Sequence, residues 1–240
     1  MGTEAYNPNN LICRAIQAIK KFVPEMLVLT DVALDPYTIH GHDGICNENG
    51  YVVNDTTVAA LVKQSLNQIQ AGADGACPSD MMDGRIQAIR NAFENNGYHN
   101  ALIISYAVKY ATCFYGPFRN AVGANIKGNK RTYQLNPANS QLAMREVLQD
   151  MQEGADAIII KPGLPYLDIV YQTSQLTKAP VWAYQVSGEY ASIKFAAKAG
   201  VIDEKSAFLE TAMSFKRAGA NGFITYAAKD LAQWIKELNG

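Results

Sequence analysis

Residues 31–44, DVALDPYTIHGHDG, hold the densest group of side chains that could do chemistry. Three carboxylates (Asp31, Asp35 and Asp43) and two imidazoles (His40 and His42) follow directly after an apolar run at 26–29. Carboxylates and imidazoles bind metal ions, and imidazoles also transfer protons in catalysis. The stretch is therefore open to three interpretations: a metal site, a catalytic loop or a polar turn.

Two lysines are the second group with chemical potential. Lys161 ends the apolar run at 157–160, and Lys109 lies just past another apolar run at 101–106. A lone lysine at a strand end most often extends its ammonium to water. If both side chains converged on a desolvated pocket, each would lower the pKa of the other, through burial and like charge. One amine would then be neutral near pH 7, as Schiff-base formation with a ketone requires.

The composition favours small-molecule chemistry over binding to nucleic acid or membranes. The chain has 240 residues, 48% of them hydrophobic and 18% charged, and its net charge is −1. It therefore offers no basic surface for an anionic polymer or lipid. The four cysteines show no CxxC spacing, so we expect neither a disulfide framework nor a structural zinc site. No apolar run is long enough to span a membrane, and we expect a cytoplasmic location.

Alternating strands and helices must position these side chains. Gly72, Gly154 and Gly219 each follow a helix-like stretch and precede a short apolar run, as expected for a turn from helix to strand. Strands are expected at 26–32, 73–78, 101–106, 155–161, 180–185 and 220–226. Helices are expected at about 9–22 and, between the strands, at 57–70, 140–152 and 203–217 among others. The order is a βα unit repeated six times.

The polar residues favour a barrel over a dinucleotide-binding sheet. They lie at or just past the end of every predicted strand: Asp31 and Asp35, Ser79 and Asp80, Lys109, Lys161, Ser187, Tyr226. In a (β/α)8 TIM barrel the active site is built at that rim, and no GxGxxG motif follows a strand here. We therefore expect an α/β fold of the (β/α)8 TIM-barrel type, forming a single domain over residues 1–240. Six units do not close an eight-stranded barrel, so the barrel is expected to be incomplete.

Several longer motifs carry a family resemblance that covers nearly the whole chain. They are TEAYNP (3–8), CPSDMMDGR (77–85), SYAVKYATCFYGPFR (105–119), KRTYQLNPAN (130–139), IIIKPGLPYLDI (158–169), AYQVSGEY (183–190) and FITYAAK (223–229). In this order they resemble the signature segments of the porphobilinogen synthases, also called delta-aminolevulinic acid dehydratases. The resemblance implies a TIM-barrel hydro-lyase that condenses two molecules of 5-aminolevulinate to porphobilinogen, with loss of two waters, in tetrapyrrole (haem) biosynthesis.

The resemblance assigns the two lysines to the two substrates. Lys161 matches the lysine that forms a Schiff base with the substrate supplying the propionate side, and Lys109 matches the lysine that engages the second substrate. An iminium withdraws electrons and so activates the neighbouring carbons for C–C and C–N bond formation. This chemistry agrees with the interpretation of the lysines from the residues alone.

Each substrate also carries a carboxylate, and the resemblance implies its partners. Arg119 and Arg131, with Gln134 close by, match the cationic clamp on the second substrate, and a guanidinium suits a carboxylate. Lys130 adjoins Arg131, and the sequence does not separate the two. Ser187 and Tyr226 match the hydroxyl pair that binds the carboxylate of the first substrate. Four more residues at the rim complete the predicted substrate-binding set: Asp31, Asp35, Ser79 and Tyr115. Taken singly, Arg119 would more often be a surface ion-pair residue, and Ser187 or Tyr226 would more often cap a strand end.

The resemblance also bears on metals. Zinc-dependent members carry three cysteines at the positions of Ala33, Asp35 and Asp43, and carboxylates do not replace thiolates as soft zinc ligands. The loop resembles instead the aspartate-rich version of members that respond to magnesium, so no active-site zinc is expected. Asp35 and Asp43 are left as either ligands of a hard cation or hydrogen-bond partners of the substrate amine. His40 and His42 are expected to be structural.

Glu146 matches the glutamate of a remote Mg²⁺ site that stabilises the assembled oligomer in many bacterial and plant members. Members of the family form homo-octamers through an N-terminal arm, and the resemblance implies that this arm and the first two βα units are absent from the chain. Whether such a truncated form assembles into an octamer, and whether it is active, are then open questions. Two alternatives to an active porphobilinogen synthase stay open: a weak or inactive homologue that acts only in assembly, and another Schiff-base lyase.

Overall fold

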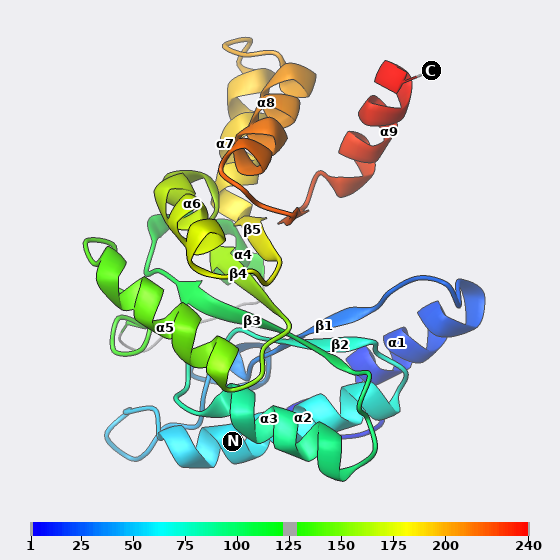
Figure 1. The fold of residues 1–240 in the computed structure, drawn as a ribbon, viewed down its shortest axis with the longest axis vertical. Helices are drawn as coiled ribbons and strands as arrows, with labels where there is room; N and C mark the ends of the chain where they lie inside the picture. The colour runs from blue at the N-terminus through cyan, green and yellow to red at the C-terminus, as the bar shows by residue number, and fades with distance from the viewer. Residues whose placement is uncertain (1, 122–128, 240) are drawn as a thin grey trace.

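The computed structural model describes residues 2–121 and 129–239 and shows six parallel strands in one sheet. The strands neighbour one another in the order of the chain, from β1 to β6 (Figure 1). They are β1 (Leu29–Val32), β2 (Gly75–Pro78), β3 (Leu102–Lys109), β4 (Ala157–Lys161), β5 (Val181–Gln185) and β6 (Gly222–Thr225). Sequential parallel pairing with a crossover between each pair is the topology of a TIM barrel. The prediction of an unclosed TIM-barrel-type fold with six βα units is confirmed.

Nine α-helices lie in the described ranges. They are α1 (Leu11–Phe22), α2 (Asn54–Gln70), α3 (Arg85–Asn95), α4 (Gly116–Ala121), α5 (Ser140–Gln152), α6 (Leu167–Leu176), α7 (Ser187–Lys198), α8 (Glu204–Arg217) and α9 (Ala228–Asn239). Helices α2, α5, α6 and α8 pack against strands β2, β3, β5 and β6. None of the helices in the described part of the chain is long and apolar enough to cross a membrane.

The two faces of the sheet have separate cores because side chains alternate along each strand. On β4, Ile158 and Ile160 pack in the larger core together with residues of the surrounding helices. Ile159 packs on the opposite face, in a smaller core to which only strand residues contribute. This smaller core is the interior of the barrel. The continuous apolar run at 157–160 is thus explained by burial on both faces, as in other parallel sheets.

Strand β3 holds one residue more than β4 over the same stretch. Ser105 pairs with Ile158 and Val108 pairs with Ile160, so three steps along β3 match two steps along β4. This irregularity is a β-bulge, a feature that bends a strand and re-aims the side chains that follow. Strand β3 also runs three residues beyond the predicted end at 106, because it continues to pair with β4.

The bulge decides where Lys109 points. Tyr106 faces the barrel interior, and both Ala107 and Val108 join the helix-facing core. Lys109 therefore faces inward, paired in register with Lys161 at the end of β4. With strict alternation after Tyr106, the Lys109 side chain would have pointed at the helices.

The sheet is open within the described residues, because β1 and β6 each have a single neighbouring strand. Large apolar side chains are exposed on α1 and just before β1, among them Leu11, Phe22 and Leu27, which are 69%, 79% and 68% exposed. Strand edges of this kind present unpaired backbone groups that can bind another strand. The carboxyl ends of all six strands nevertheless meet at one rim, and this rim carries the site.

Candidate active site

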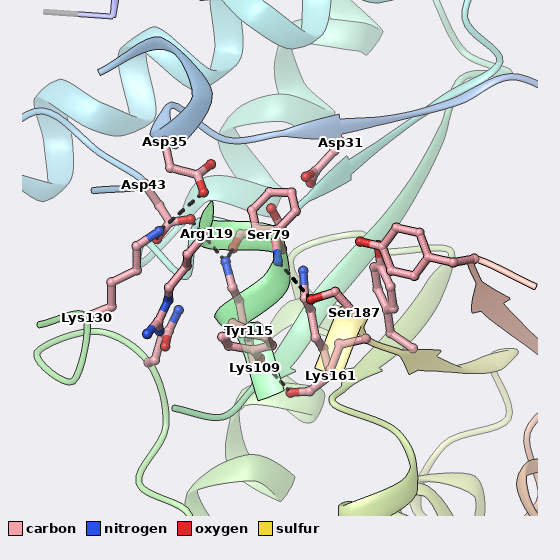
Figure 2. Close-up of a pocket in the computed structure, with 15 residues that line it drawn as sticks. Asp31, Asp35, Asp43, Ser79, Lys109, Tyr115, Arg119, Lys130, Lys161 and Ser187 are labelled. Atoms are coloured by element: carbon pink, nitrogen blue, oxygen red, sulfur yellow. Dashed lines mark hydrogen bonds and ion pairs between the residues drawn. The ribbon is translucent and has the colours of Figure 1, made fainter. Parts of the chain in front are cut away.

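A pocket opens at the carboxyl ends of the strands and gathers most of the predicted site residues (Figure 2). Each of the six strands, or the loop directly after it, contributes to the wall. The lining consists of Asp31, Asp35, Asp43, Ser79, Lys109, Tyr115, Phe118, Arg119, Lys130, Gln134, Lys161, Tyr184, Val186, Ser187 and Tyr226. The sequence-based expectation that rim residues converge is therefore met for both lysines.

Lys161 lies at the end of β4 among aromatic rings. Its Nζ is 4.6 Å from the ring centre of Tyr184, 5.0 Å from that of Tyr106 and 5.5 Å from that of Tyr115. Burial lowers the pKa of Lys161 to about 8, and the charge of Lys109 adds to the effect. A measurable fraction of this amine is therefore neutral at pH 7, which is the condition for attack on a carbonyl.

Lys109 is buried but keeps its proton. Its Nζ donates to Asp43 Oδ1 at 3.1 Å and to the backbone carbonyl of Ser79. Burial alone would lower the pKa of Lys109, but the Asp43 carboxylate, with help from Asp35 and Asp31, raises it above the usual value. The expectation that each lysine lowers the pKa of the other is thus correct for Lys161 and wrong for Lys109, because the carboxylates neutralise the second ammonium.

Asp43 is the counter-ion of two ammonium groups. Its Oδ1 accepts from Lys109, and its Oδ2 lies 3.0 Å from Lys130 Nζ, which also contacts Asp35 Oδ2 at 3.3 Å. Burial would raise the pKa of Asp43, but the two lysines hold it well below its usual range. The pKa of Asp35 is raised, first by burial and then by the charge of Asp43.

The two histidines of the same loop pack beside this cluster. His42 is buried, and its Nδ1 lies 3.0 Å from the Tyr133 hydroxyl, while its backbone N–H donates to His40 Nδ1 at 3.2 Å. Among the residues that the structure describes, no three His, Cys, Asp or Glu side chains form a metal-binding group. A hard-cation site at Asp35 and Asp43 stays a prediction.

The four predicted carboxylate-binding residues Arg119, Gln134, Ser187 and Tyr226 all line the pocket. The guanidinium of Arg119 lies over the Tyr115 ring at 5.8 Å, and Gln134 is buried with its Oε1 lacking a hydrogen-bond partner in the described ranges. Ser187 Oγ accepts from the Phe118 backbone N–H at 3.1 Å. Tyr226 is half exposed. Each of the four can therefore present a polar group to a ligand in this pocket.

Two predicted residues lie outside the pocket. Arg131 is exposed, and it lines a neighbouring depression together with Glu146 and Asp83. Lys130, the adjacent residue, is buried in the pocket through its ion pairs with Asp35 and Asp43. The sequence did not separate Lys130 from Arg131, and the structure shows that Lys130 points into the pocket while Arg131 points away from it.

Sequence reasoning named Tyr115 but not the other two tyrosines around Lys161. Tyr106 and Tyr184 face the interior and surround the amine of Lys161. Alternation along the strand at 180–185 could have placed Tyr184 inward, since Ala183 packs against helices. Alternation along the strand likewise places Tyr106 on the same face as Ile104.

Comparison with known proteins identifies relatives over almost the full chain. Residues 1–234 match the family described as delta-aminolevulinic acid dehydratase. The chain is 52% identical over 237 residues to the delta-aminolevulinic acid dehydratase of Bradyrhizobium diazoefficiens, covering 98% of this chain and 67% of that protein. It is 51% identical over 235 residues to the chloroplastic enzyme of Physcomitrium patens, covering 98% of this chain and 54% of that protein.

Solved structures agree with the sequence comparison. The fold superposes with a TM-score of 0.98 on delta-aminolevulinic acid dehydratase (porphobilinogen synthase) from Toxoplasma gondii in complex with the reaction product porphobilinogen. The two are 49% identical, and the match covers 100% of this chain and 69% of that one. The chain thus spans about half to two thirds of the length of these relatives. A pyruvate carboxylase from Rhizobium etli, at 14% identity and a TM-score of 0.54, shares the fold alone.

The difference between the two lysines predicts their reactivity. Competitive acylation with a trace of acetic anhydride, read by peptide mass spectrometry, should label Lys161 increasingly from pH 6 upward and level off above about pH 9. The direction follows from its pKa of about 8, because the neutral fraction rises with pH until that value is passed. Lys109 should stay weakly labelled across this range. Stronger labelling of Lys109 than of Lys161 at pH 7–8 would contradict the assignment.

The double ion pair of Asp43 predicts a stability effect. Asp43→Asn leaves two buried ammonium groups without their shared carboxylate, so the free energy of unfolding should fall by about 3–5 kcal/mol. Urea unfolding followed by circular dichroism measures the change. Glu237→Gln is the matched control: it removes the exposed ion pair with Lys205 at 2.8 Å and should have no measurable effect. Equal stability of Asp43→Asn and the wild type would show that the pairs contribute nothing.

Proposed function

We propose the function of this chain from one premise: the chain belongs to the delta-aminolevulinic acid dehydratase family. The proposed activity is that of a porphobilinogen synthase, a hydro-lyase that condenses two molecules of 5-aminolevulinate to porphobilinogen and two waters in tetrapyrrole biosynthesis. One observation carries the proposal. Lys161, with a pKa of about 8, lies in register beside Lys109 in one pocket at the rim of the barrel.

Lys161 is the proposed nucleophile. Its neutral amine attacks the ketone carbon of the first substrate, the carbinolamine takes up a proton from water and loses water, and a protonated C=N bond remains. This iminium draws electrons from the neighbouring carbon, which can then lose a proton and act as a carbon nucleophile. The faces of Tyr106, Tyr115 and Tyr184 around Nζ stabilise a cation in this position.

Lys109 is proposed to engage the second substrate. As an ammonium beside Asp43, it donates hydrogen bonds to the substrate carbonyl and polarises it, and it can form a second Schiff base only after it loses its proton. Asp43 itself is a poor proton acceptor, since its pKa is held well below the usual range. The free amine of a substrate molecule or a water is therefore the better proton acceptor.

The two substrate carboxylates need separate partners. Ser187 and Tyr226, on the side of Lys161, are proposed to bind the carboxylate of the first substrate. Arg119 and Gln134, with Lys130 rather than Arg131, are proposed to bind that of the second. Lys130 is preferred because it lines the pocket and Arg131 does not. Asp31, Asp35, Ser79 and Tyr115 complete the wall.

Mg²⁺ is proposed as the metal, bound at Glu146 away from the pocket. Glu146 and Asp83 line one depression and offer the oxygen ligands that Mg²⁺ prefers. Burial and the charge of Asp150 raise the pKa of Glu146, so a cation there would relieve an electrostatic cost. Bound Mg²⁺ would supply positive charge to this acidic depression. We further propose that the active site holds no zinc and that the chain forms a homo-oligomer, an octamer as in the family. A cytoplasmic location is also proposed, and it is supported by the four unpaired cysteines.

Removal of the proposed nucleophile tests the mechanism. Lys161→Ala should reduce porphobilinogen formation from 5-aminolevulinate by more than about 10⁴-fold, because the covalent intermediate cannot form. Borohydride trapping with 5-aminolevulinate should place an adduct on Lys161 in the wild type and none in the variant. Lys198→Ala, at an exposed position on α7, is the control and should retain full turnover. Normal turnover by Lys161→Ala would refute the proposed mechanism.

Metal removal tests the proposed magnesium-responsive type. A zinc-selective chelator should leave activity intact, since the loop carries Ala33, Asp35 and Asp43 where zinc-dependent members carry cysteines. EDTA should lower activity, added Mg²⁺ should restore it, and Glu146→Ala should abolish that response. Strong inhibition by the zinc chelator, reversed by zinc alone, would contradict this part of the proposal.

A further inference from the structure

Glu189 is a buried carboxylate for which the proposed mechanism has no use. It lies on the first turn of α7, two residues after Ser187, and only 4% of its surface is exposed. No lysine or arginine pairs with it in the described ranges, so backbone N–H groups alone stabilise its charge. Burial disfavours the charged form and raises the pKa of Glu189 to about 7, although the backbone donors act in the opposite direction. A charge held at such a cost calls for a role beyond packing.

The two carboxylate oxygens bind two different loops. Oε2 accepts from the backbone N–H of Val186 at 2.7 Å, the ordinary contact of a glutamate at this position of a helix. Oε1 accepts at 2.7 Å from the backbone N–H of Leu164, in the loop that follows Lys161 at the end of β4. A single side chain thus connects the residue before Ser187 with the residue three places after Lys161.

Both loops leave little room for adjustment. The Gly163 N–H donates to the carbonyl of Tyr184 at 2.7 Å, and a Cβ on Gly163 would lie 2.7 Å from the Phe215 ring. A Cβ on Gly188 would lie 2.5 Å from the carbonyl oxygen of Phe114. The segments on either side of the Glu189 carboxylate are therefore closely packed, and the carboxylate joins them.

The proposed first substrate reaches across the same two segments. In 5-aminolevulinate, two methylene groups separate the carboxylate from the ketone. One molecule held by Ser187 and attacked by Lys161 therefore requires a fixed separation between the hydroxyl and the amine. A mismatch of about 1 Å in such a geometry can slow a reaction about 10²-fold.

We propose that Glu189 is a positioning residue that sets the separation between Lys161 and Ser187 for a substrate with a carboxylate two methylenes from its ketone. The inference rests on the proposed function. Glu189 is not among the residues that line the pocket, and it acts through the backbone of Leu164 and Val186. A role of this kind affects ligands that bind at both points and spares those that bind only at the amine.

Two small ketones separate these cases. Levulinate carries the carboxylate and the ketone of the substrate without its amine, and 2-pentanone has the same ketone without a carboxylate. Borohydride trapping of each on Lys161, followed by mass spectrometry, should be faster for levulinate in the wild type. In Glu189→Gln, whose amide can accept one of the two hydrogen bonds but not both, trapping of levulinate should slow about 10- to 100-fold. Trapping of 2-pentanone should stay within about twofold of the wild type, because the Lys161 amine is unchanged.

Controls distinguish failure of this inference from failure of the proposed function. Ser187→Ala should lose the preference for levulinate as Glu189→Gln does, and Glu210→Gln, an exposed glutamate on α8, should keep it. If Glu189→Gln does not fold, Glu189→Asp, which keeps the charge but shortens the reach to Leu164, replaces it in the same comparison. Unchanged trapping of levulinate, or an equal loss for both ketones, would overturn the role of Glu189. Equal adduct formation in Lys161→Ala would instead refute the proposed function.

Discussion

The ion pairs of Asp43 determine the chemistry that the pocket can support. Two lysines brought together in a buried site cannot both stay charged without counter-ions, and Asp43 contacts Lys109 and Lys130 but not Lys161. Lys109 is therefore held as an ammonium, while Lys161, surrounded by tyrosine rings, has a pKa of about 8. The position of this carboxylate thus gives two chemically identical side chains different pKa values, raised for Lys109 and lowered for Lys161.

This division depends on backbone geometry as well as on charge. The β-bulge in β3 turns Lys109 into the barrel interior, where Asp43 and Ser79 receive its hydrogen bonds. Strand β4 needs no such device, because regular alternation already points Lys161 inward. The two lysines reach the same pocket by different local structures, and the register between the strands brings them side by side.

Much of the site could be predicted from the sequence because the fold concentrates strand ends at one rim. Apolar runs marked the six strands, and the polar residues that follow them include Asp31, Ser79, Lys109 and Ser187, all of which line the pocket. Lys130 and Arg131 could not be told apart, because no pattern in KRTYQ says which of them points inward. Tyr106 and Tyr184 were missed because an aromatic residue in a predicted strand is expected to be part of the hydrophobic core.

The sequence by itself determined the family, the order of the βα units and the end of the strands at which chemistry could occur. These follow from local patterns, namely apolar periodicity, turn residues and motifs of a few residues. The tertiary structure alone decided the direction in which the pKa of each lysine shifts and the link that Glu189 makes between two loops. Asp43 and Lys109 are 66 residues apart, and Glu189 and Leu164 are 25 apart. Electrostatic and hydrogen-bond energies depend on distance in space, which the order of residues along the chain does not contain.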